Sequence, residues 1–181
     1  QVVLLGTRAP EAGFSNIATG IVMSGYFAGI FACSIIVPHI LARVGHVRVF
    51  GAMSAIASAA VLLHVVFLDP FVWTGMRFAS GFSFAGMYIV CESWLNEKAT
   101  NETRGQLLSL YMITNMAGMA AGQLMISLGE EGSAGLFLLA SVMVSIAVVP
   151  ILITASAAPS FEAPERISFR RLVQVSPLAV V

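Results

Sequence analysis

Residues 17–41 read IATGIVMSGYFAGIFACSIIVPHIL, a run without Asp, Glu, Lys or Arg. At 1.5 Å per residue, a helix of this length crosses the roughly 30 Å hydrocarbon core of a bilayer. Period-two alternation is missing, and lipid requires every backbone amide to be satisfied within the segment, so a helix is the expected element. This run therefore predicts a transmembrane helix.

The whole chain shares this apolar character. Hydrophobic residues make up 58% of its 181 residues and charged residues 10%, with a mean hydropathy of +0.91. Soluble domains carry about 25% charged residues, so this chain has too few charged residues to form the surface of a soluble domain. The net charge of zero also argues against a nucleic-acid partner. The lipid bilayer is the expected surrounding of most of the chain.

Apolar length predicts an all-α membrane protein with five complete spans. The other four predicted spans cover residues 49–68, 71–94, 106–128 and 134–153. Both ends are apolar, and we interpret them as the tail of helix one and, at residues 176–181, the start of helix seven. Residues 1–157 then form an N-terminal transmembrane half, and residues 158–175 a cytoplasmic linker.

The positive charges predict the orientation of the spans. The loops at 42–48, 95–105 and 157–175 hold seven of the nine Lys and Arg residues. On the opposite side we expect only Arg8, in a loop, whereas Arg77 lies within a span. The positive-inside rule makes the three basic loops cytoplasmic. We expect a multi-pass protein of the bacterial inner membrane.

Several short motifs resemble those of the major facilitator superfamily. Arg43, Gly45 and Arg48 are similar to its loop between helices two and three, and Arg77 with Gly81 resembles its R-x-x-x-G signature in helix four. Residues 101–106, NETRGQ, are similar to an element of the following cytoplasmic loop. Residues 92–97, ESWLNE, resemble a bacterial branch, the YcaD-like proteins.

This resemblance implies a twelve-helix fold, of which the chain is the six-helix N-terminal half. Each half is built from three-helix inverted repeats around a central cavity. The implied function is secondary active transport of a small molecule by alternating access, coupled to protons. The implied partners are the substrate, protons and the C-terminal half of the same chain. No enzyme activity and no cofactor are expected. A metal site is not expected either, because the three histidines are scattered without a local carboxylate.

Arg77 is the main candidate for the substrate or proton path. An Arg at the centre of a span costs about 2.5 to 3.5 kcal/mol, so it normally faces a cavity or a partner. The alternative is an Arg whose long stem reaches the outer interface. We add to this path four polar residues, Tyr88 in the same span and, in other spans, Tyr26, Asn115 and Gln123.

The gating loop is expected to involve Arg43, Gly45, Arg48, Glu92 and Arg104. Because Ala42 stands where the family motif has Asp, we expect the Glu92 carboxylate to pair with the Arg43 guanidinium at the inner end.

Two small-residue steps, Gly25 with Gly29 and Gly118 with Gly122, predict close helix packing. A different class of function stays open: a transporter-shaped protein that acts as a sensor or assembly partner without transport. An intramembrane serine protease is disfavoured. In residues 81–86, GFSFAG, Ala85 stands where the nucleophile motif G-x-S-x-G has its final glycine.

Overall fold

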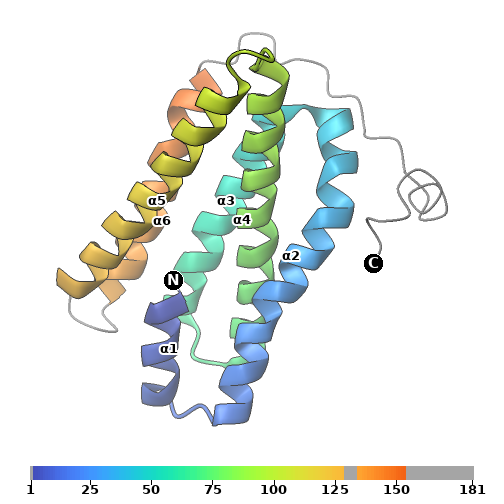
Figure 1. Cartoon of the computed structure of the whole chain (residues 1–181). Helices are drawn as coiled ribbons and strands as arrows, with labels where there is room; N and C mark the ends of the chain where they lie inside the picture. Colours follow the sequence, from blue (N-terminus) through green and yellow to red (C-terminus); the bar gives the residue numbers. More distant parts are fainter. Residues whose placement is uncertain (1, 129–133, 154–181) are drawn as a thin grey trace, which may run out of the picture.

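The computed structural model describes residues 2–128 and 134–153, which form an elongated bundle of six helices (Figure 1). The helices are α1 (Val2–Glu11), α2 (Asn16–Val44), α3 (His46–Val66), α4 (Pro70–Lys98), α5 (Arg104–Leu128) and α6 (Ala134–Ile153). No strand occurs among the described residues, so the all-α prediction is confirmed. The predicted linker at 158–175 and the start of helix seven lie outside the described residues.

Length and polarity separate the helices into two kinds. α2, α3 and α6 are long and apolar enough to cross a membrane by composition alone. α4 and α5, with 29 and 25 residues, are as long but more polar. The polar side chains of α4 turn inward, and Arg77, Ser80 and Ser83 are all buried. A helix of this kind spans a bilayer when its polar face meets other helices rather than lipid.

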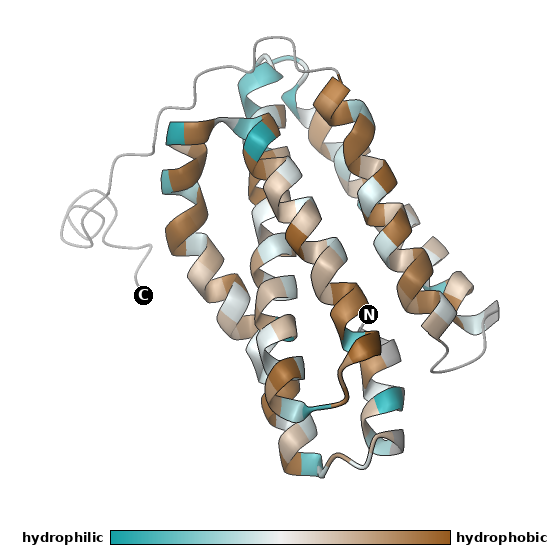
Figure 2. Ribbon diagram, turned by 180° about the vertical axis from the view of Figure 1, so that it is seen from behind, coloured by the Kyte–Doolittle hydropathy of each residue, from teal (hydrophilic) through white to brown (hydrophobic). Residues whose placement is uncertain are grey.

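The outside of the bundle is apolar. Ile17, Phe31 and Phe71 are 77%, 71% and 88% exposed, and hydrophobic residues run along most of the length of the helices, with hydrophilic ones gathered near their ends (Figure 2). Soluble monomeric proteins rarely expose a contiguous apolar surface of this size. This outer surface fits contact with lipid.

Two predicted loop assignments are wrong at the ends of the helices. α1 continues past Gly6 as far as Glu11, so Arg8 is helical rather than part of a loop. Leu5 and Ala9, one turn apart, are fully buried on one face of α1, which explains why the helix continues. α4 likewise continues to Lys98, so only residues 99–103 of the expected 95–105 loop lie between helices.

The expected loop at 42–48 reduces to a single residue. α2 ends at Val44 and α3 begins at His46, with Gly45 between them. Gly45 has φ 86° and ψ 163°, a conformation that glycine adopts without the steric cost a Cβ would bring. Arg43 and Arg48 therefore belong to the two helices on either side of a sharp turn.

α2 and α4 pack backbone to backbone through glycines. A Cβ placed on Gly29 would lie 2.7 Å from the Phe82 amide nitrogen and would also collide with the Phe78 carbonyl. A Cβ on Gly81 would collide with the Tyr26 carbonyl. The packing role of the Gly25 and Gly29 step is thus visible in the α2–α4 contact.

The second glycine step has no such partner in the described part of the chain. Within 4 Å of a Cβ on Gly118 or Gly122 there is no other atom, and few contacts join α5 to α4. α3 and α6, by contrast, are joined by hydroxyls: Ser58 Oγ lies 2.6 Å from Ser141 Oγ and 2.9 Å from Ser145 Oγ. The packing predicted for Gly118 and Gly122 is therefore not found among these helices.

Candidate functional site: a buried arginine and histidine

Arg77 lies inside the bundle on α4. It is 2% exposed, and its guanidinium carbon lies 4.4 Å from the centre of the Tyr26 ring on α2. This distance is that of a cation–π contact. Nε and Nη1 are buried and donate no hydrogen bond to any described group. The side chain is therefore enclosed by neighbouring helices, which disfavours the alternative of an Arg reaching the outer interface.

His64 on α3 lies close to Arg77. The Trp73 ring centre is 5.7 Å from that of His64, and Trp73 precedes Arg77 by one turn of α4. His64 and Arg77 are near enough to interact electrostatically. The imidazole is fully buried, with Nδ1 2.5 Å from the Ala60 carbonyl oxygen and Nε2 without a hydrogen-bond partner among the described groups.

Acidic groups do not neutralise this centre within the described residues. Arg77 forms no ion pair there. The carboxylates with described side chains are all exposed and lie toward the helix ends: Asp69, Glu92, Glu97 and Glu102. Asp69 caps the start of α4, with one carboxylate oxygen accepting from the Phe71 and Val72 amides at 2.9 Å. The interior centre is consequently cationic.

The other path residues are distributed unevenly. Tyr26 lies against Arg77, and Tyr88 on α4 is near enough to interact electrostatically with Tyr26. Asn115 is half-buried on α5, where its side-chain nitrogen donates to the Tyr111 carbonyl at 3.0 Å. Gln123 is exposed on the same helix. The structure thus brings Tyr26 to Arg77, while Asn115 and Gln123 stay predictions for the path.

His64 was not predicted as a site residue from the sequence, because its neighbours come from another helix. Its position in the predicted span at 49–68 was visible, but its contact with Trp73 follows only from the packing of α3 on α4. The signal that was available is a titratable side chain inside an otherwise apolar span, which by itself marks a functional candidate.

At the opposite end of the bundle, His46 joins the start of α3 to the end of α4. Its Nε2 lies 3.1 Å from Ser93 Oγ and 3.5 Å from a Glu97 carboxylate oxygen, and its ring lies beside Trp94. The sequence shows no local carboxylate near His46, but the packing of α3 on α4 supplies one. Glu97 is 51 residues away in sequence and becomes a neighbour only through helix packing.

The expected pair of Arg43 with Glu92 is not formed among the described residues, where both side chains are exposed. Arg104 is exposed as well, at the first residue of α5. A gating role for these three residues stays a prediction. Among the described residues, the close contact between a basic and an acidic side chain at this end joins His46 to Glu97.

We expect the His46–Glu97 contact to contribute measurably to stability. A double-mutant cycle with His46→Ala and Glu97→Gln should give a coupling free energy of about 0.5 to 1 kcal/mol in unfolding, the range for a partly exposed pair. The same cycle with Glu92→Gln in place of Glu97→Gln should be additive. Additivity in both cycles would contradict an energetic link between α3 and α4 through this pair.

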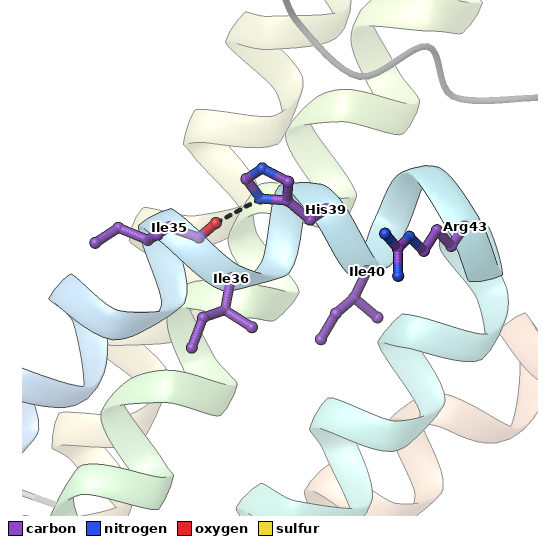
Figure 3. A pocket seen from close by; sticks show the side chains of 5 residues that line it. All are labelled: Ile35, Ile36, His39, Ile40 and Arg43. Carbon is purple, nitrogen blue, oxygen red and sulfur yellow. Dashed lines mark hydrogen bonds between the residues drawn. The ribbon is translucent and has the colours of Figure 1, made fainter. Parts of the chain in front are cut away.

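A shallow hollow lies on the surface of α2 near the same end (Figure 3). Its lining comes from one helix: Ile35, Ile36, His39, Ile40 and Arg43. His39 Nδ1 lies 2.7 Å from the Ile35 carbonyl oxygen. Because only exposed or half-buried side chains of a single helix form it, this hollow is an open helix face rather than an enclosed binding site.

Comparison with known proteins identifies the family. The sequence matches the Major Facilitator Superfamily over residues 2–178, and the chain belongs to this superfamily of membrane transporters. It is 29% identical over 130 residues to the uncharacterized MFS-type transporter YcaD of Salmonella arizonae, covering 70% of this chain and 34% of that protein. It is 30% identical over 136 residues to the uncharacterized MFS-type transporter YE1530 of Yersinia enterocolitica, covering 74% and 35%.

The chain thus spans about a third of the length of these curated relatives. No solved structure matches it. The resemblance to the superfamily and to its YcaD-like branch is confirmed, and the helical bundle is that of a multi-pass membrane protein consistent with the N-terminal half of the superfamily fold.

Proposed function

We propose that this chain forms the N-terminal half of a secondary active transporter that moves a small molecule across the bacterial inner membrane. Transport proceeds by alternating access and is coupled to protons. The observation that carries the proposal is Arg77, a guanidinium enclosed in the bundle without an acidic partner among the described residues. Placing Arg in a span is costly, and such residues mark substrate and ion pathways.

The sidedness of the proposal follows from charge. We place the turn at Gly45 and the connection between α4 and α5 on the cytoplasmic side, because Arg43, Arg48, Lys98 and Arg104 border them. These two connections lie at the same end of the bundle, whereas the connections from α1 to α2 and from α3 to α4 lie at the other (Figure 1). That alternation supports the proposed topology.

A transporter-shaped sensor is the second candidate. It is favoured by one observation, the alanine at position 42 where the family motif has Asp, together with the unformed Arg43–Glu92 pair. Burying a guanidinium in the bundle costs free energy, and a protein that only senses or assembles gains little from it. We therefore prefer transport.

The test uses everted membrane vesicles from cells that express the longer protein containing this chain. A panel of metabolites and drugs is added, and the internal pH is followed with a fluorescent probe. We expect one class of compound to trigger a pH change that vesicles without the protein lack. Folded, inserted protein that stays silent across the panel would argue for the sensor.

A further inference from the structure

Two of the buried polar side chains come from neighbouring helices and carry nitrogens without a hydrogen-bond partner among the described groups. They are Arg77 on α4 and His64 on α3. We propose that together they bind an anionic group of the transported substrate, a carboxylate or a phosphate. This inference rests on the proposed transport function and names the class of its substrate.

The guanidinium is the first half of the site. Arg77 presents two N–H groups, on Nε and Nη1, that are buried without an acceptor among the described groups. A planar pair of donors matches the two oxygens of a carboxylate or phosphate. A buried charge without a partner is unfavourable by several kcal/mol, and an anion of opposite charge relieves this cost. Tyr26 covers one face of the guanidinium, so the two unpaired N–H groups at its edge are the donors that we assign to the ligand.

The imidazole is the second half. The short contact of His64 Nδ1 with the Ala60 carbonyl oxygen fixes Nδ1 as the donor, so Nε2 of the neutral ring is an acceptor. A neutral His64 offers no donor to an anion. Once Nε2 takes up a proton, it becomes a second donor beside Arg77.

The charged surroundings of His64 make the proton and the anion depend on each other. Arg77 on α4 is the charged group that acts on His64. Tyr26 on α2 contacts Arg77. Arg8 on α1 lies with its guanidinium 5.5 Å from the Phe137 ring of α6, which belongs to the same core cluster as Trp73. A second cation next to Arg77 is unfavourable in a low-dielectric interior unless an anion lies between them. Each ligand therefore favours the binding of the other, which is the coupling that joint transport of a proton and an anion requires.

The binding experiment measures thermal unfolding of the purified longer protein in detergent. The probes are sodium succinate, sodium glycerol phosphate and, at matched ionic strength, sodium chloride, at pH 5.5 and 7.5. We expect one oxyanion probe to raise the unfolding temperature, more at the lower pH. Arg77→Gln should weaken its binding by about ten- to a hundredfold, the effect of losing a charge-assisted hydrogen bond. His64→Gln should keep binding and lose the pH dependence.

Lys98→Gln is the matched control, since it removes one positive charge from an exposed position of the same helix. It should leave the stabilisation by the probe unchanged. Succinate without glycerol phosphate would assign the site to carboxylates, and the reverse result would assign it to phosphates.

Three results would overturn the anion site: no stabilisation by either oxyanion over chloride, equal stabilisation in Arg77→Gln, or equal loss in Lys98→Gln. A parallel uptake assay in proteoliposomes with glucose and tetraethylammonium separates the two proposals. Uptake of either compound without oxyanion binding keeps the transport function and removes the anionic substrate class.

Discussion

We expect Arg77→Ala to abolish the proposed transport while the protein remains folded, and Arg77→Lys to retain part of the activity. The physical reason is that Lys keeps a positive charge at the end of a long stem but loses the planar pair of donors. Substrate-triggered pH change in everted vesicles measures this effect. Unaltered transport by the Ala variant would remove Arg77 from the mechanism.

The same position should show the opposite effect on stability. Arg77→Leu replaces a buried, unpaired guanidinium by an apolar side chain, and we expect the unfolding free energy to rise by about 2 to 3 kcal/mol, comparable to the cost of placing Arg in a span. If Arg77 had a purely structural role, the substitution would lower the free energy of unfolding instead. Lys98→Leu, at an exposed position of α4, should change the free energy of unfolding by no more than about 0.5 kcal/mol.

Gly81→Val is expected to prevent α2 and α4 from packing. The first atom of the new side chain would overlap the Tyr26 backbone, which cannot move aside as a flexible side chain does. Overpacking of a well-packed core typically costs 1 to 3 kcal/mol, and we expect at least about 2 kcal/mol here. The yield of monodisperse protein in detergent and its unfolding temperature measure the effect.

Gly75→Val is the matched control for that substitution. Gly75 lies on the same helix and meets no atom within 4 Å of an added Cβ. Both changes carry the same helix-propensity term, so their difference isolates the contact with α2. Equal stability of the two variants would show that the helices approach one another less closely than described.

Span-scale features of this fold were predictable from sequence, because lipid imposes them directly. The charge-free run at 17–41, which lies within α2, depends on composition alone, and composition is visible without a structure. The limits of the helices were predicted less well. Residues 96–98 are polar and exposed, as in a loop, but continue α4 as an exposed helical turn.

The candidate site was predictable only in part. Arg77 stood out because one guanidinium in an apolar span is anomalous by itself. His64 and the His46–Glu97 contact did not, because each depends on which faces of α3 and α4 meet. The face of a helix that turns inward is poorly marked when both faces are apolar, as they are in α3. Local spacing contains no information on contacts of this kind.

The one-residue junction at Gly45 has a mechanical consequence. Because only one residue links α2 to α3, a tilt of α2 must displace the first turn of α3. His46 in that turn contacts Ser93 and Glu97 of α4. The ends of α2, α3 and α4 at this junction then form one rigid unit. We expect a rocking motion of the bundle to rotate about this unit rather than to change its internal angles.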